Sequence, residues 1–189
     1  MPNWCDNEIV IKGSPEVLTE IDNIISENEN GFQMNDFVPL PEHLRDTTSS
    51  GGSDKFTSAL AGNTSIEYDN WYDWSLANWG TKWDVSDAYR SNDVGQILLS
   101  YQTAWAPNIN FWAQFTEKYP VEVEHRYYEE GVCFIGEATI KDGEIDDYCV
   151  EIDETIYKQA GVILQEDGTI DWESGQDYSL ADAFPLRRN

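Results

Sequence analysis

The chain has 189 residues, in which 11 lysine and arginine residues stand against 36 aspartate and glutamate residues, so the formal charge is −25. This excess of carboxylates excludes proteins that hold nucleic acid or anionic lipid on a basic face. Apolar residues make up 40% of the chain and aromatic residues 13%, which is typical of a folded domain and excludes a disordered acidic tail.

The length predicts a single domain spanning residues 1–189. The cysteines Cys5, Cys133 and Cys149 are odd in number and show no CxxC spacing, so we expect neither a disulfide framework nor a zinc site. The N-terminus lacks a basic segment followed by an apolar run, and no apolar stretch is long enough to span a bilayer. The sequence therefore predicts a cytoplasmic protein without a membrane partner.

The first elements are a strand and a helix. Residues 4–12 alternate apolar and polar side chains, which predicts a strand that ends at Gly13. Ser14 then provides an N-cap, and Pro15 suits the first position of a helix. The apolar residues of this helix form one stripe: Val17, Leu18, Ile21, Ile24 and Ile25.

Residues 31–79 are predicted to be an irregular, tryptophan-rich insertion. Small and polar residues over 47–65 indicate a mobile surface loop. A short helix is expected over 68–78, with Gly80 at its C-terminal end. A weak strand is expected near 82–87.

Regular alternation returns after the insertion. Residues 96–105 predict a strand, and Pro107 and Asn108 begin a second helix that Pro120 ends. Residues 121–128 show the cleanest alternation in the chain and predict another strand.

A hairpin is expected to extend the sheet at its C-terminal side. Its strands are 132–140 and 144–152, joined by the two-residue turn Asp142-Gly143. In the C-terminal extension, residues 153–189, Asp167-Gly168 marks a further turn, and 178–184 predict a short helix.

This order of elements predicts an α+β fold of the ferredoxin-like βαββαβ type, an antiparallel sheet with helices on one face. The core is expected to comprise residues 1–30 and 80–152. The insertion interrupts it, and the C-terminal β-hairpin and extension follow it.

Four short motifs occur in sequence: PNWCDN (2–7), NWGTKWD (78–84), TAWAP (103–107) and EEGVCFIGE (129–137). Together they resemble the YubB-like family, a ferredoxin-like family of uncharacterised proteins carried by bacteriophages and conjugative plasmids. The resemblance covers most of residues 1–152. It implies an accessory gene of a mobile element, expressed in a bacterial cytoplasm, where many such genes blunt host defences. The family offers no established catalytic residues to place on this chain.

The sequence shows no recognisable catalytic constellation, so no enzyme is predicted. His125 alternates with apolar residues and is interpreted as a structural core histidine, whereas His43 is expected at the surface. A thiol nucleophile at Cys133 or Cys149, next to the strand of His125, remains an alternative. Residues 142–147 fail the spacing of a calcium loop, and no phosphate-binding glycine motif occurs, so we predict no metal and no cofactor.

The tryptophans suggest a ligand pocket. An aromatic cage would stack a nucleotide base, and a lysine would reach its phosphate. The alternative is that these aromatic side chains form core packing. The candidate pocket residues are Trp74, Asn78, Trp79, Lys82, Trp83 and Trp105.

The carboxylates suggest the leading functional hypothesis. On the predicted open sheet face, where RNA-binding modules of this fold carry aromatic and basic residues, the chain carries acids such as Asp6 and Glu8. Carboxylates at i and i+2 of a strand lie about 7 Å apart and can imitate successive phosphates. We therefore expect a non-enzymatic inhibitor that binds the basic surface of a host nucleic-acid-binding protein, against the alternative that the charge only confers solubility. The predicted partner-binding residues are Glu122, Glu124, Glu137, Glu144, Asp146, Asp147, Glu151, Asp153 and Glu154.

Overall fold

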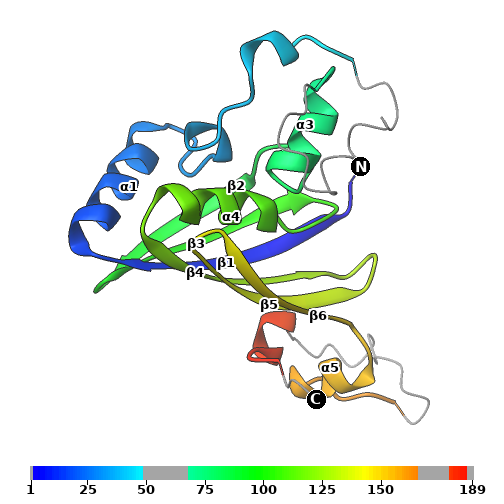
Figure 1. Cartoon of the computed structure of the whole chain (residues 1–189). Helices are drawn as coiled ribbons and strands as arrows, with labels where there is room; N and C mark the ends of the chain where they lie inside the picture. Colours follow the sequence, from blue (N-terminus) through cyan, green and yellow to red (C-terminus); the bar gives the residue numbers. More distant parts are fainter. Residues whose placement is uncertain (1, 49–67, 166–178, 187–189) are drawn as a thin grey trace.

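The computed structural model describes residues 2–48, 68–165 and 179–186 (Figure 1). Six strands form one antiparallel sheet in the order β2-β3-β1-β4-β5-β6. The strands are β1 (Trp4–Gly13), β2 (Ser86–Asp93), β3 (Gln96–Ala104), β4 (Val121–Glu129), β5 (Phe134–Lys141) and β6 (Glu144–Glu151). The first four strands in chain order have the ferredoxin-like arrangement, and the β5–β6 hairpin extends it, so the predicted fold class is confirmed.

Four α-helices and three short 3-10 turns complete the described chain. The helices are α1 (Pro15–Glu27), α3 (Trp71–Asn78), α4 (Ile109–Lys118) and α5 (Glu154–Gln159). The 3-10 turns are η1 (Met34–Asp36), η2 (Glu42–Leu44) and η4 (Leu180–Ala183). Side-chain caps explain where several of these begin, since Ser14 accepts a hydrogen bond from the N–H of Val17 and Asn70 from that of Asp73.

The main core lies between the sheet and the helices α1 and α4, which pack on the same face (Figure 1). Inward residues of β1 and β4, such as Ile9, Ile11 and Val123, meet Ile21 of α1 and Trp112 of α4 there. The rings of Trp112 and Phe32 stack at 5.6 Å. This is the face that the period-2 and period-3.6 patterns predict to be buried.

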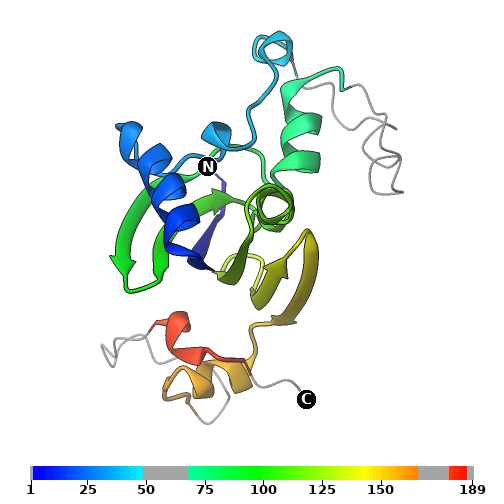
Figure 2. The same cartoon turned by 60° about the vertical axis from the view of Figure 1, so that its left-hand side comes forward.

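A second, smaller core lies on the opposite face of the sheet. The C-terminal segment with α5 and η4 packs there, as both views show (Figure 1, Figure 2). Ile135 of β5 faces this segment and packs with Ile156 and Leu180. This side of the sheet is called the open-face side below, and the part of it that the described chain leaves uncovered is called the open face.

The structure differs from the sequence predictions at several elements. The weak strand expected near 82–87 is β2, which lies later at Ser86–Asp93 and takes its register from main-chain pairing with β3. Helix α5 was not expected. The short terminal helix is the 3-10 turn η4. The predicted loop 47–65 lies almost entirely outside the described residues, and the predicted turn at 167–168 lies wholly outside them.

Candidate functional site

The strand register separates the predicted partner-binding carboxylates into two sets. Cross-strand neighbours share a face, so the pairing of Glu8 with Arg126 and of Arg126 with Glu137 places these three side chains together on the open-face side. The predicted residues on that side are Glu122, Glu124, Glu137, Glu144 and Asp146. Asp147 and Glu151 of β6 lie on the helix-covered side, and Asp153 and Glu154 lie at the start of α5. The structure therefore does not bring the nine predicted residues into one row.

Several of these carboxylates already have partners within the chain. Glu124 forms an ion pair with Lys12 at 2.5 Å, and Glu122 forms one with Lys141 at 3.5 Å. The carboxylate of Glu137 accepts the backbone N–H of Leu186 at 3.3 Å. Such half-exposed ion pairs contribute little stability and remain exchangeable with a binding partner.

The carboxylates away from the open face have local structural roles. Asp147 accepts the hydroxyl of Tyr127 at 2.7 Å. Burial, together with the hydrogen bond to Asp147, raises the pKa of that hydroxyl. Asp153 caps α5 by accepting the N–H groups of Thr155 and Ile156 at 2.8 and 3.1 Å. Glu154 pairs with a lysine one turn along the same helix.

An acidic cleft lies on the open face over β1, β2 and β3, with a volume of about 370 Å³. Its carboxylates are Asp6, Glu8 and Asp87, and the ring of Tyr128 lines it too. Gln102 donates to Asp6 at 2.9 Å. Burial, followed by the charge of Asp6, raises the pKa of the Tyr128 hydroxyl.

The position of Asp87 in this cleft depends on a β-bulge. The β2–β3 register shifts between Ser86 and Tyr89, and Asp87 adopts a positive φ of 52°. A bulge of this kind redirects a side chain relative to the regular alternation. The sequence carries no pattern that would have revealed Asp87, because the predicted strand nearest to it stopped there.

The predicted tryptophan pocket is divided by the structure. Trp74 and Trp79 are buried against each other at 5.3 Å, and the indole N–H of Trp79 donates to the backbone carbonyl of Val38. The side chain of Asn78 donates to the carbonyl of Trp74 within α3. Trp105, directly after β3, is 47% exposed and does not line the cleft described next.

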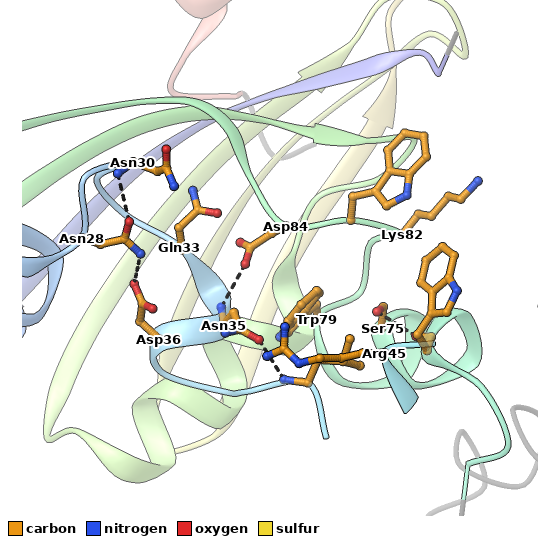
Figure 3. A pocket seen from close by; sticks show the side chains of 13 residues that line it. Asn28, Asn30, Gln33, Asn35, Asp36, Arg45, Ser75, Trp79, Lys82 and Asp84 are labelled. Carbon is orange, nitrogen blue, oxygen red and sulfur yellow. Dashed lines mark hydrogen bonds between the residues drawn. The ribbon is translucent and has the colours of Figure 1, made fainter. Parts of the chain in front are cut away.

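A second cleft of about 370 Å³ lies between α3, the segment that follows it, and the region from the end of α1 to η2 (Figure 3). Of the six predicted pocket residues, Trp79, Lys82 and Trp83 line it. Trp71, Ser75 and Asp84 come from the same part of the chain. A distant segment supplies the rest: Asn28, Asn30, Gln33, Asn35, Asp36, Leu40 and Arg45. Trp71 was visible in the sequence as a neighbour of Trp74, but no sequence signal placed the asparagines or Arg45 here.

His125 is fully buried, in agreement with its predicted core position. Its Nε2 lies 2.8 Å from Oδ1 of Asn7, and burial lowers its pKa to about 3. Burial raises the pKa of the thiols of Cys5 and Cys149. A raised thiol pKa is the reverse of what activates a nucleophilic cysteine.

The described residues offer neither a metal-binding cluster nor a membrane-spanning helix. Within residues 2–48, 68–165 and 179–186, no cluster of three or more histidine, cysteine or carboxylate side chains suits a metal ion. Over the same residues, the helices are all too short or too polar to cross a bilayer.

Residues 78–167 match the family described as "Ferredoxin-like domain in Api92-like protein". Among solved structures, the chain is similar to the crystal structure of protein api92 from Yersinia pseudotuberculosis, with a TM-score of 0.51 and 8% identity over 78% of this chain and 98% of that one. At this identity the likeness shows the fold alone. No curated protein matches the chain.

Proposed function

We propose that this chain, whose residues 78–167 match the ferredoxin-like domain of Api92-like proteins, is a non-enzymatic acidic protein that binds the nucleic-acid-binding surface of another protein. The acidic cleft of Asp6, Glu8 and Asp87 is the observation that carries the proposal. A cleft of this charge beside an aromatic ring suits the lysine and arginine side chains that normally hold phosphates.

The charge around the cleft supports the same proposal. The strand register places nine carboxylates on this side of the sheet against three cations, so the surface retains a strong negative potential. The carboxylates are Asp6, Glu8, Asp87, Asp93, Glu122, Glu124, Glu137, Glu144 and Asp146, and the cations are Lys12, Arg126 and Lys141. Such a field speeds association with a basic partner and makes it sensitive to salt.

The proposed binding region is narrower than the row expected from the sequence. The C-terminal segment contacts the β4–β5 part of this sheet face, where Arg126 lies over the ring of Phe184 at 5.4 Å and Glu137 binds the backbone of Leu186. The cleft reaches β4 only at Tyr128, which packs against the second core, whereas its carboxylates lie on β1 and β2, farther from those contacts. We therefore centre the partner site on the cleft and on Glu124, and not on Asp147, Glu151, Asp153 or Glu154.

The test compares two triple variants that change the net charge equally. The cleft variant is Asp6→Asn, Glu8→Gln and Asp87→Asn. The control is Glu20→Gln, Glu27→Gln and Glu29→Gln, which neutralises exposed residues on and directly after α1, on the other side of the sheet. Each protein is immobilised and exposed to a bacterial lysate at low and at high salt, and bound proteins are challenged with duplex DNA.

The proposal expects the native chain and the control to retain a DNA-binding protein that high salt or duplex DNA releases. The cleft variant should lose most of that binding. If both variants lose binding equally, binding depends on the net charge and not on the acidic cleft. That outcome would favour the alternative that the charge only confers solubility. If the native chain retains no nucleic-acid-binding protein, the proposed function is wrong.

We further propose that the chain belongs to a bacteriophage or conjugative plasmid and acts in the bacterial cytoplasm on a defence component, such as a restriction or CRISPR protein. The four YubB-like motifs support this origin. Expression of the native chain should protect incoming foreign DNA in a host with an active restriction or CRISPR system, and the cleft variant should not. Protection by both proteins would separate that activity from the acidic cleft.

A further inference from the structure

The cleft beside α3 differs in chemistry from the acidic cleft, and it is independent of the proposed partner site. Three tryptophans line it, Trp71, Trp79 and Trp83, and Trp83 is 40% exposed. The buried ring of Trp79 forms part of the wall, and its N–H is already bound to a main-chain carbonyl. The cleft thus offers aromatic surface for stacking, and its volume of about 370 Å³ lies within the range of small-molecule sites.

Lys82 supplies a positive charge at the aromatic end. Its ammonium lies over the ring of Trp83 at 4.4 Å and near that of Tyr72 at 5.7 Å. Within the described chain it has no carboxylate at ion-pair distance, although acids outnumber bases threefold in the sequence. Exposed cation–π contacts are weak, so the ammonium is free to turn to an anion.

Amide side chains gather at the opposite end of the cleft. Figure 3 shows Asn28, Asn30, Gln33 and Asn35 around the loop that follows α1. Asn35 accepts the N–H of Leu40 through its carbonyl, so its amide NH₂ is not used in that bond. Gln33 donates to a backbone carbonyl, which leaves its own carbonyl oxygen as an acceptor. This end therefore presents both donors and acceptors to a ligand.

A partly buried carboxylate holds that end in place. Asp84 accepts the backbone N–H groups of Met34 at 2.7 Å, Asn35 at 3.1 Å and Val85 at 2.8 Å. These bonds tie the turn η1 to the segment that carries Lys82 and Trp83. The amide end and the aromatic end are thus fixed relative to each other before any ligand binds, which lowers the entropic cost of binding.

We propose that this cleft binds a nucleotide. Its base lies against Trp71 and Trp83, its phosphate meets the ammonium of Lys82, and the amides of Gln33 and Asn35 face its polar edges. Base stacking on tryptophan tolerates any base, so the recognition of one base over another depends on the amide end. The guanidinium of Arg45, whose Nε is bound to Glu42 at 2.8 Å, keeps further N–H donors on the same cleft.

The experiment is a calorimetric titration of the full chain with the four ribonucleoside 5′-monophosphates, the matching nucleosides and inorganic phosphate. We expect at least one monophosphate to bind, its nucleoside to bind several-fold more weakly, and inorganic phosphate to bind most weakly. Trp83→Ala should weaken monophosphate binding about tenfold, as expected for loss of one stacking surface. Lys82→Gln should weaken monophosphate binding several-fold and leave nucleoside binding unchanged.

The matched control is Trp105→Ala, which removes a tryptophan of similar exposure that lies outside the cleft. It should bind nucleotides like the native chain, and near-ultraviolet circular dichroism should show that all three variants are folded. No heat of binding with any of the nucleotides at millimolar concentrations would overturn the proposal. So would equal losses in Trp83→Ala and Trp105→Ala, or an affinity for nucleosides that equals that for monophosphates. The variant that neutralises Asp6, Glu8 and Asp87 should keep nucleotide binding. The outcome of the nucleotide titration is therefore independent of whether the proposed partner binding is right.

Discussion

The two faces of the sheet use the same strands for opposite purposes. On the helix-covered face, β4 contributes Val121, Val123 and His125, all of them buried. On the other face, the alternate residues Glu122 and Glu124 remain partly exposed and pair with lysines of neighbouring strands. The first face holds the fold together, and the second leaves charged side chains available to a partner.

The covered face also holds polar groups, which bond mainly to one another; among the described residues, Nδ1 of His125 is buried without a hydrogen-bond partner. Asn7 donates to the hydroxyl of Thr103 at 2.9 Å and lies 2.8 Å from Nε2 of His125. Buried polar groups need such partners, because an unmet hydrogen bond in the interior is costly. The comparison shows that polar side chains alone do not indicate a binding surface in this chain, because those on the covered face bind one another. What distinguishes the acidic cleft is that its carboxylates Asp6, Glu8 and Asp87 lie together on a face that the described chain leaves partly uncovered.

The largest difference between the faces should appear when Trp112 is replaced. Trp112 is completely buried, packs on Phe111 and Phe115, and donates to the hydroxyl of Tyr101 at 2.9 Å. We expect Trp112→Ala to reduce the free energy of unfolding by about 3–5 kcal/mol in urea denaturation. On the other face, Glu122→Gln, which removes the half-exposed ion pair with Lys141, should change it by about 0.5 kcal/mol or less.

If Trp112→Ala does not fold at all, Trp112→Phe provides the measurement. It keeps an aromatic ring and loses the hydrogen bond to Tyr101, so a loss of about 1–3 kcal/mol is expected. Similar losses for Trp112→Phe and Glu122→Gln would contradict the division between the two faces.

A smaller and more local effect is expected from Leu180. This side chain belongs to η4 and packs with Ile135, Ile156 and Ala183 in the second core. We expect Leu180→Ala to destabilise the packing of the C-terminal segment by about 2 kcal/mol. Hydrogen exchange should then show faster exchange in α5 and η4, whereas β1 and β4 stay protected. Equal acceleration in β1 would mean that the two cores unfold as one unit.

The smallest expected effect is the pH dependence that His125 adds. Its pKa is lowered to about 3 in the folded chain, against about 6.5 in an unfolded chain. The unfolded state therefore binds more protons between these values, so the stabilising contribution is complete above pH 6.5 and is lost as the pH falls towards 3. Between pH 6.5 and pH 5 the loss should be about 1–2 kcal/mol.

This pH dependence is measured as urea denaturation at pH 7.5 and at pH 5 for the native chain and for His125→Gln. The variant should lose less stability on acidification than the native chain, and the exposed His43→Gln serves as the control for removal of an imidazole. The same loss in all three proteins would assign the acid sensitivity to the carboxylates instead.

Sequence patterns predicted the elements whose side chains alternate or form a stripe. Strand β4 and helix α1 were located to within one or two residues, because their buried faces are continuous in the sequence. Strand β2 was misplaced, since SDAYRSND is mostly polar, shows no regular alternation and pairs with β3 through its main chain. Helix α5 has six residues and one buried side chain, Ile156, which is too little for a periodic signal.

The candidate sites were harder to predict for a different reason. The acids Asp6 and Glu8 were assigned to the open face correctly, because alternation determines the face of a strand residue. Asp87 joins them through a bulge, and Arg45 joins Trp83 through the path of a long insertion. Neither the position of Asp87 nor that of Arg45 follows from local periodicity, since both depend on where distant segments come together.

The central position of β1 has a consequence for how the chain is made. Trp4 pairs with Ala104 and Asp6 pairs with Tyr128, so neither edge of β1 can find its neighbour until most of the chain has left the ribosome. Until then Ile9 and Ile11 have only the adjacent helix α1 to cover them. Folding thus waits for long-range pairing, which is slow and leaves apolar strands exposed on the nascent chain. The abundant negative charge should keep these unfinished chains apart through mutual repulsion.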